Sequence, residues 1–152
     1  MIEIRAGGLD QPQVIALRQA HLDDMHATAP AESVHALDAS ALNAEGVSFF
    51  TARDGDVVLG CGALKRLSGD AAEIKSMRTC ALARGKGAGT AMLNHLIDVA
   101  KCEGIGRLYL ETGTAEFFAP ARRLYLRRGF VLCGPFADYV EDPHSVFMVL
   151  AL

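Results

Sequence analysis

The distribution of apolar and polar residues divides the chain into short strand-like segments and longer segments with helical periodicity. Apolar residues that recur every three or four positions predict helices over residues 11–28, 34–43, 90–103 and 116–128. Segments typical of β-strands cover residues 2–5, 47–53, 57–67, 72–80, 107–112, 130–133 and 146–150. Strands and helices therefore share the chain.

Turn signals between these segments indicate how the strands connect. Asp54-Gly55 separates two strands by a hairpin turn, and residues 68–70 make the next turn. Helices join the strands of the second half, as parallel neighbours require. The order βααβββαβαββ predicts an α/β (α+β) fold with one mixed central sheet of about seven strands and helices on both faces. Because no linker or repeat interrupts it, residues 1–152 are expected to form a single domain.

A glycine-rich stretch lies between a predicted strand and a predicted helix. Residues 84–89 read Arg-Gly-Lys-Gly-Ala-Gly, so a ligand can approach the bare backbone closely. The first turn of a helix has free amides and the positive end of a dipole, which bind anions. We interpret this stretch as a pyrophosphate cradle. Its expected ligating residues are Arg84, Gly85, Lys86, Gly87, Ala88, Gly89 and Thr90.

Two common phosphate-binding loops do not match this stretch. The loop of nucleoside triphosphatases needs Lys before Ser or Thr after its last glycine, whereas no lysine precedes Thr90. A dinucleotide fingerprint needs Gly-x-Gly-x-x-Gly in the first βαβ unit, whereas these glycines are spaced Gly-x-Gly-x-Gly past the middle of the chain. A nucleotide-binding domain is therefore disfavoured.

Composition narrows the class of protein further. Of the 152 residues, 51% are hydrophobic, which is enough for a full core and argues against disorder. The net charge of −3 argues against a general nucleic-acid surface. The four cysteines form no CxxC pair and are interpreted as buried reduced thiols. No apolar run is long enough to span a bilayer and no leader precedes the first strand, so a cytoplasmic protein is expected.

Two motifs together resemble the GNAT superfamily of N-acetyltransferases. Arg84, Gly87 and Gly89 are similar to its acetyl-CoA loop, Arg-x-x-Gly-x-Gly. Residues 121–125, Ala-Arg-Arg-Leu-Tyr, followed by Gly129-Phe130, look like its Ala-x-x-Leu-Tyr-x-x-x-Gly-Phe segment. Because the predicted element order is also that of the GNAT fold, the resemblance covers essentially the whole chain.

The resemblance implies acetyl-CoA as the acetyl donor and co-substrate. In that family the strand before the loop, here residues 72–80, splays away from its neighbour, here residues 107–112. The pantetheine arm lies in the opening and pairs with main-chain groups, which the resemblance assigns to Met77 and Thr79. One such amide would also hold the thioester oxygen as negative charge develops on it.

Acetyl transfer to an amine requires a base, because an ammonium with a pKa of about 10.4 is protonated at neutral pH. Glu73 is the candidate: it matches a glutamate that some GNAT members use, and strand alternation puts it on one side with Lys75 and Met77. Glu73 can instead pair with Lys75 or a neighbouring basic residue as a solvated strand charge. The resemblance also implies that Tyr125 protonates the departing CoA thiolate, although an aromatic residue at helical spacing can equally be packing.

Three other side chains bear on the site. Glu111, on the adjacent strand, is the competing carboxylate, or a structural hydrogen-bond partner near the glycine loop. His35 lies in a short helix expected to rim the acceptor pocket, where it can bind substrate, assist proton transfer or be structural. Phe118 stands where many family members have an asparagine that touches the CoA arm. The other histidines show no ligand spacing, so no metal is expected.

These patterns predict transfer of an acetyl group from acetyl-CoA to an amine by direct attack in a ternary complex, since no cysteine is placed to carry an acyl intermediate. The alternative is a CoA-binding sensor or partner module without catalysis. A small-molecule amine is favoured over a protein acceptor, and the acidic residues 138–142 either attract a cationic amine or form a solvated loop. A homodimer through the last strands or the sheet edge is a further expectation. Two segments, residues 33–37 and 134–148, are similar to a group of small single-domain bacterial GNAT members.

Overall fold

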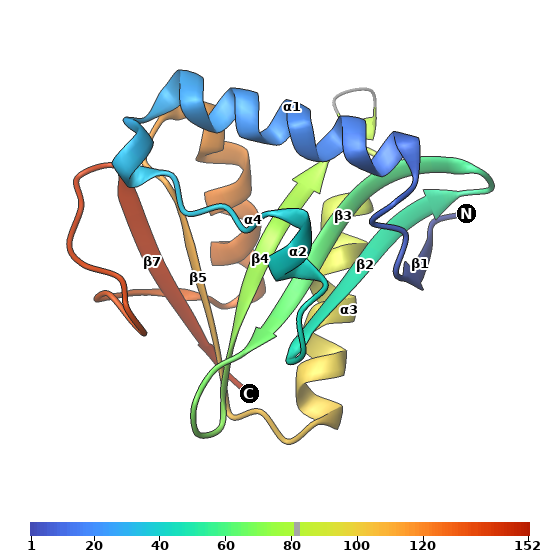
Figure 1. The fold of residues 1–152 in the computed structure, drawn as a ribbon. Coiled ribbons are helices and arrows are strands. Elements are labelled where there is room, and N and C mark those ends of the chain that lie inside the picture. Colours follow the sequence, from blue (N-terminus) through green and yellow to red (C-terminus); the bar gives the residue numbers. More distant parts are fainter. Residues whose placement is uncertain (81–82) are drawn as a thin grey trace.

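A computed structural model describes residues 1–80 and 83–152, with helices on both faces of one seven-stranded sheet (Figure 1). The strands are β1 (Glu3–Ala6), β2 (Val47–Asp54), β3 (Val57–Arg66), β4 (Ala71–Thr79), β5 (Arg107–Gly113), β6 (Val131–Cys133) and β7 (Ser145–Ala151). The helices are α1 (Pro12–Thr28), α2 (Ala39–Leu42), α3 (Ala88–Cys102) and α4 (Ala119–Arg128), with 3-10 turns η1 (Ala31–Ser33) and η3 (Glu116–Phe118). The predicted element order and the seven-stranded mixed sheet are confirmed.

The sheet has the strand order β1-β2-β3-β4-β5-β7-β6. Neighbouring strands are antiparallel except β4 and β5, which are parallel and are joined through α3. The hairpin expected between β2 and β3 is confirmed, and Gly55 in its turn has a φ of 58° that favours glycine. β4 therefore has an antiparallel neighbour, β3, on one side and a parallel neighbour, β5, on the other.

Side chains of the strands alternate between two hydrophobic cores. Phe49 and Ala63 pack with α1 and α2, whereas the adjacent residues Phe50 and Leu64 pack with α3 and α4. Figure 1 shows α1 and α2 crossing the near side of the sheet and α3 and α4 behind it. We call these two sides the α1 face and the α3 face.

The helix expected over residues 34–43 shrinks to the four residues of α2. The side chain of Asp38 caps α2, whereas the Ser33 hydroxyl donates to Asp142 Oδ2 at 2.6 Å. The His35 carbonyl accepts a hydrogen bond from a lysine of β4 instead of a helical amide. Tertiary contacts of this segment therefore replace the helical hydrogen bonds that its periodicity favoured.

α1 crosses the sheet at one end, near the carboxyl-terminal end of β4 (Figure 1). It starts with Pro12, its N-cap residue is Gln11, and no side chain caps it. Val14 and Leu17 anchor it in the core. Within residues 1–80 and 83–152, no helix combines the length and the apolar character that crossing a bilayer requires.

All four cysteines are free thiols, but the expectation that they are buried is only partly met. Cys61 is buried, Cys80 and Cys133 are half-buried, and Cys102 is exposed. Burial raises the pKa of Cys61 to about 12, which keeps this thiol protonated and unreactive at neutral pH.

Candidate functional site

β4 and β5 separate at their carboxyl-terminal ends (Figure 1). Their pairing ends at Ile74 opposite Leu110, although β4 continues to Thr79 and β5 to Gly113. The splay that the sequence predicts between these strands is confirmed. Backbone groups of β4 beyond Ile74 are therefore not used by β5 and can pair with an extended ligand.

An extra residue in β4 interrupts the alternation of its side chains. Cys61 of β3 pairs with Arg78, whereas Ala63 pairs with Lys75, so three steps along β4 oppose two along β3. Ser76 has a φ of 52°, in the left-handed region that residues other than glycine seldom adopt. β4 consequently contains a β-bulge at the point where it leaves β5.

The expectation that Glu73 and Met77 share one side of β4 is wrong, because the bulge lies between them. Glu73 pairs in register with Lys65 on the α1 face, whereas the Met77 side chain packs against the core beneath α3 and α4. Thr79 also faces α3, since a Cβ built on Gly89 would lie 3.4 Å from Thr79 Oγ1. One strand therefore presents side chains to both faces beside the opening.

A cavity passes through the opening and connects the two faces of the sheet. α1 and residues 33–37 wall it on the α1 face, and η3 and α4 contribute to the wall on the α3 face. Among the described residues, Glu73 does not line it. The titratable residues of the wall are Arg18, His21, His35, Lys75, Glu111, Tyr125 and His144.

Glu111 and Tyr125 reach this cavity from opposite faces. Burial raises the pKa of Glu111 above its usual range, although the Ser145 hydroxyl and the charge of Lys75 oppose the shift. Burial, and then the negative charge of Glu111, raise the pKa of Tyr125, which is 5% exposed. The carboxyl is thus a stronger base than in water, while the phenol stays protonated at neutral pH. The opening therefore places a proton acceptor on one side and a proton donor on the other.

Glu73 belongs to a buried hydrogen-bonded cluster behind the cavity. The Tyr139 hydroxyl donates to Glu73 Oε2 at 2.6 Å, and Lys75 Nζ donates to the same hydroxyl at 2.8 Å. Lys75 Nζ also lies 3.4 Å from Glu73 Oε2 and donates to the His35 carbonyl at 2.7 Å. Glu73 pairs with Lys75, as the alternative to a catalytic role predicted, but the pair is buried and not solvated as expected. Since Glu73 is 2% and Lys75 9% exposed, the pair depends on these hydrogen bonds.

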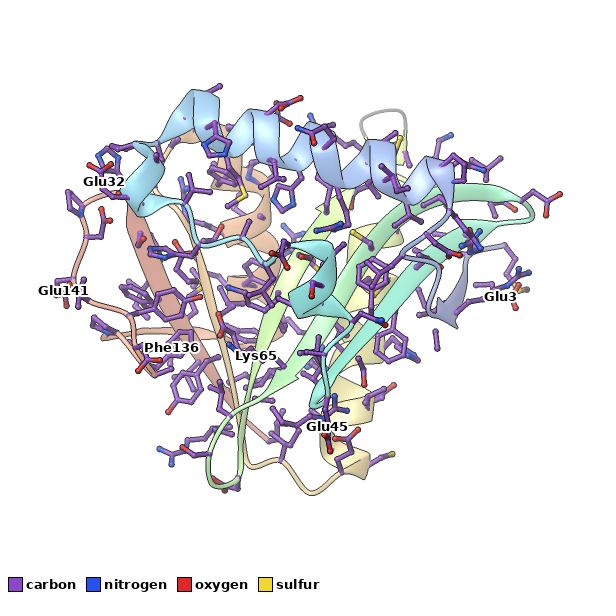
Figure 2. The ribbon with its side chains drawn as sticks, in the orientation of Figure 1. Glu3, Glu32, Glu45, Lys65, Phe136 and Glu141 are labelled. Carbon is purple, nitrogen blue, oxygen red and sulfur yellow. The ribbon has the colours of Figure 1, made fainter. Side chains whose placement is uncertain are left out.

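Tyr139 is the site residue that the sequence did not single out. It lies in the loop between β6 and β7, whose Phe136 stacks on Tyr109 of β5 at 4.7 Å and packs against β7 (Figure 2). The Tyr139 ring contacts Phe136 and also meets the His35 ring edge-on at 4.9 Å. Two aromatic residues three positions apart in one loop were the available signal.

One residue of the acidic stretch 138–142, Asp142, has a structural role. Asp142 accepts hydrogen bonds from the Ser33 hydroxyl and from the His144 amide, which ties η1 to the β6–β7 loop. Glu32 and Glu141, on these two segments, lie at the same end of the molecule (Figure 2). The loop and η1 are therefore fastened together beside the cavity.

We expect Tyr139→Phe to lower the free energy of unfolding by about 1–3 kcal/mol, because it leaves the buried Glu73 carboxylate and the Lys75 ammonium without a shared partner. Tyr109→Phe is the matched control, since the Tyr109 hydroxyl makes no hydrogen bond with the described residues and its ring stacks in the same cluster. Urea unfolding of both variants measures the effect. Equal stability of the two variants would show that the Tyr139 hydroxyl does not stabilise the cluster.

The glycine-rich stretch turns the chain into α3, which begins at Ala88 rather than at Thr90. Gly85 and Gly87 have φ angles of 81° and 84°, and Gly87 is the N-cap of α3. The Lys86 amide donates to a backbone carbonyl at 3.2 Å. Within the part of the chain that the structure describes, the amides of residues 87–90 have no partner, as is usual in the first turn of a helix. These free amides can bind an anion.

The first turn of α3 adjoins the opening between the strands. A Cβ built on Gly89 would lie 3.4 Å from both Thr79 Oγ1 of β4 and Leu124 Cδ2 of α4. Arg84 and Lys86 are exposed and bring positive charge to the same end of α3. Free amides, local positive charge and unpaired strand backbone together fit the diphosphate and the attached arm of acetyl-CoA.

Phe118, which stands in place of the family's asparagine, packs tightly on β5. A Cβ built on Gly113 would lie 2.4 Å from Phe118 Cδ2, so the ring covers bare backbone and lines the cavity. The neighbouring Phe117 ring has the guanidinium groups of Arg78 and Arg84 at 5.6 Å and 5.4 Å from its centre. Aromatic rings thus replace the amide side chain at this edge of the opening. Among the described residues, no group of His, Cys, Asp or Glu side chains is arranged to hold a metal ion.

Known proteins are similar to the chain in both sequence and structure. The model of the acetyltransferase (GNAT) family matches residues 14–130. An uncharacterized N-acetyltransferase of Bacillus subtilis (strain 168), YsnE, is 46% identical over 151 residues, which cover 99% of this chain and 100% of the relative. The IAA acetyltransferase of Azospirillum brasilense is 37% identical over 137 residues, covering 90% and 86%. A Bacillus subtilis acetyltransferase solved in complex with CoA has a TM-score of 0.72 at 18% identity, covering 100% of this chain and 99% of that one.

Proposed function

The chain belongs to the acetyltransferase (GNAT) family, and on that premise we propose that it transfers the acetyl group of acetyl-CoA to the amine of a small-molecule acceptor by direct attack in a ternary complex. The main support for this proposal is that Glu111 and Tyr125 line one cavity from opposite sides of the opening between β4 and β5. The small-molecule acceptor is supported by the relative named IAA acetyltransferase.

The transfer requires a proton acceptor for the amine and a proton donor for the sulfur, and residues of the opening supply both. Glu111 accepts a proton from the acceptor ammonium, which leaves a neutral nitrogen to attack the acetyl carbon. The main chain of Met77 and Thr79 pairs with the CoA arm and supports the thioester oxygen as charge develops on it. Tyr125 donates its proton to the departing sulfur. His35 binds the acceptor from the cavity wall.

Glu73 is a second candidate base that reaches the cavity indirectly. Its carboxylate accepts from the Tyr139 hydroxyl, and a proton can pass to it only through that hydroxyl or a water. Glu111 needs no such relay, because it lies on the cavity wall. The two assignments differ in which Glu→Gln variant loses turnover.

Acetyl-CoA binding tests the premise of the proposal. Thr90→Glu places a carboxylate in the first turn of α3, where it favours the helix but repels a diphosphate. We expect this variant to fold normally and to bind acetyl-CoA at least about tenfold more weakly, as a like charge a few ångströms away predicts. Isothermal titration calorimetry measures the dissociation constant.

Thr90→Gln is the control for the change in side-chain size, because it adds the same bulk without charge. It should bind acetyl-CoA like the wild-type protein. Equal affinities of the Glu and Gln variants for acetyl-CoA would show that the diphosphate does not bind at the first turn of α3. No binding of acetyl-CoA by the wild-type protein at millimolar concentration would end the proposal.

The alternative function, a CoA-binding sensor or partner module without catalysis, makes a different prediction. It binds acetyl-CoA but releases no free thiol with any amine. The joint presence of Glu111 and Tyr125 on one cavity supports the enzyme, because a sensor needs neither a base nor an acid there. A thiol-release assay over a panel of amines separates the two functions.

A further inference from the structure

Most charged groups around the α1 face of the cavity are paired within the protein. Arg78 Nη2 lies 2.5 Å from Asp24 Oδ2, and Lys75 Nζ lies 3.4 Å from Glu73 Oε2. These four groups balance one another, so they leave no net charge for a ligand.

Two charged residues of the wall remain without an ion-pair partner among the described residues. They are Arg18 of α1 and Glu111 of β5, and their charges are opposite. Removing a charge from water costs free energy that an opposite charge recovers. A ligand that carries both a positive and a negative group would therefore satisfy both residues.

Arg18 is placed to bind an anion. It is half-buried and lines the cavity. Its Nη2 donates one hydrogen bond to the Leu37 carbonyl at 3.0 Å. A guanidinium has five N–H donors, so most of them remain for a ligand, and its planar fork matches a carboxylate.

His21, one turn along α1 from Arg18, limits the charge of this anion site. Burial, followed by repulsion from Arg78, lowers the pKa of His21 to about 4, so its imidazole is neutral at pH 7. His21 therefore offers a hydrogen bond without a second positive charge. One unpaired positive charge suits a single carboxylate better than a phosphate dianion.

One stretch of the wall on the α1 face is apolar. Leu22 and Met25 of α1 and Val34 and Leu37 of the following segment line the cavity. Such a wall binds a hydrocarbon group and offers no partner to a polar one.

From these three features we infer that the acceptor is an amino acid with an apolar side chain. Its carboxylate binds Arg18, its amino group lies at Glu111, and its side chain packs on the apolar wall. Glu111 takes the first ammonium proton before the attack. The N–C bond to the acetyl group then forms as the C–S bond breaks, the thiolate takes the Tyr125 proton, and the second proton of the nitrogen passes through water to the Tyr125 phenolate. The inference deepens the proposed function and rests on it, because acetyl transfer is what places the amine at Glu111.

Matched acceptors test the carboxylate. The panel consists of leucine, methionine and phenylalanine, their carboxamides, and their decarboxylated amines, each assayed with acetyl-CoA by thiol release. We expect kcat/KM of the wild-type protein to be about 10- to 100-fold higher for the amino acids, as a charge-assisted hydrogen-bonded pair predicts. Carboxamides and amines that react as well as the amino acids would overturn the inference.

Arg18→Gln should lower kcat/KM for the amino acids by about 10- to 100-fold and leave the carboxamides and amines unchanged. Comparing each compound between proteins removes the effect of its own amine pKa. Arg18→Lys keeps the charge and should recover part of the loss. Arg107→Gln is the control, because Arg107 is exposed and lies at the other end of β5. An equal loss on all compounds would make Arg18 a structural residue and overturn the inference.

Binding separates a failure of this inference from a failure of acetyl transfer. If no panel compound reacts although CoA binds, thiol release over the wider panel of amines tests acetyl transfer, and calorimetry with N-acetylmethionine on the CoA-bound protein tests the carboxylate site alone. Binding that Arg18→Gln weakens about tenfold or more supports the site. Absent binding, or binding that Arg18→Gln does not change, overturns it.

Discussion

Glu111→Gln is expected to lower kcat/KM by about 100- to 10,000-fold, the range that loss of a general base produces. The glutamine side chain has nearly the shape of the native one but cannot accept a proton, so the loss reports on chemistry. In the wild-type protein, kcat/KM should fall at acid pH with a midpoint above the usual carboxyl pKa, because burial raises the pKa of Glu111. The part of this decrease in kcat/KM that comes from protonation of Glu111 should be absent from Glu111→Gln.

The same variant should be more stable than the wild-type protein at neutral pH. The pKa of Glu111 is raised in the folded state, so its contribution to stability is complete below the unfolded pKa and is lost as pH rises through the folded pKa. The substituted amide has no charge to desolvate and escapes this loss. Thermal unfolding should therefore show a higher midpoint for the variant at pH 7 and no difference near pH 4.

Glu73→Gln is the comparison that decides between the two carboxylates. If Glu111 is the base, Glu73→Gln should lose stability through the Tyr139 and Lys75 cluster and retain most of its turnover. Loss of turnover in Glu73→Gln together with near-normal turnover in Glu111→Gln would assign the base to Glu73, acting through Tyr139.

Tyr125→Phe is expected to lower kcat by about 100-fold while the dissociation constant of acetyl-CoA stays within about twofold, because the hydroxyl acts on the departing sulfur and the ring keeps its packing. Burial raises the pKa of Tyr125, so the phenol is a proton donor throughout an assay from pH 6 to about 9. Steady-state kinetics with calorimetry measure the two quantities.

A packing control sharpens this prediction. The Tyr125 ring meets Phe130 at 5.8 Å, and Phe130→Leu perturbs the packing without touching the hydroxyl. The packing control should therefore change stability more than kcat. Equal kcat values for Tyr125→Phe and the wild-type protein would remove the acid role and leave Tyr125 as a core residue.

Local sequence patterns were sufficient to predict those elements whose conformation depends on residues nearby in the chain. Periodicity located α1, α3 and all seven strands within a few residues, because amphipathic spacing and the strand pleat are set by near neighbours. Glycines at 85 and 87 predicted the turn into α3, since their positive φ angles are a local requirement. Tyr125 was predicted through its motif, and its burial beside the cavity agrees with that choice.

Predictions failed where a distant segment supplied the deciding contact. The helix expected over residues 34–43 is mostly absent, because Ser33 and the His35 carbonyl bond to residues more than 30 positions away. The shared side of Glu73 and Met77 failed for a related reason: the bulge at Ser76 follows from the register of β3 against β4. Alternation predicts a face only while the register is unbroken.

The amino-acid sequence by itself determined the order of the elements, the glycine-rich turn into α3 and the family of the chain. Only the tertiary structure decided which carboxylate lies on the cavity, that Tyr139 closes a cluster around Glu73, and that Arg18 and Glu111 are left without ion-pair partners among the described residues. The physical reason is that secondary structure arises from interactions within a few residues, whereas burial and charge pairing depend on side chains that folding brings together from far along the chain.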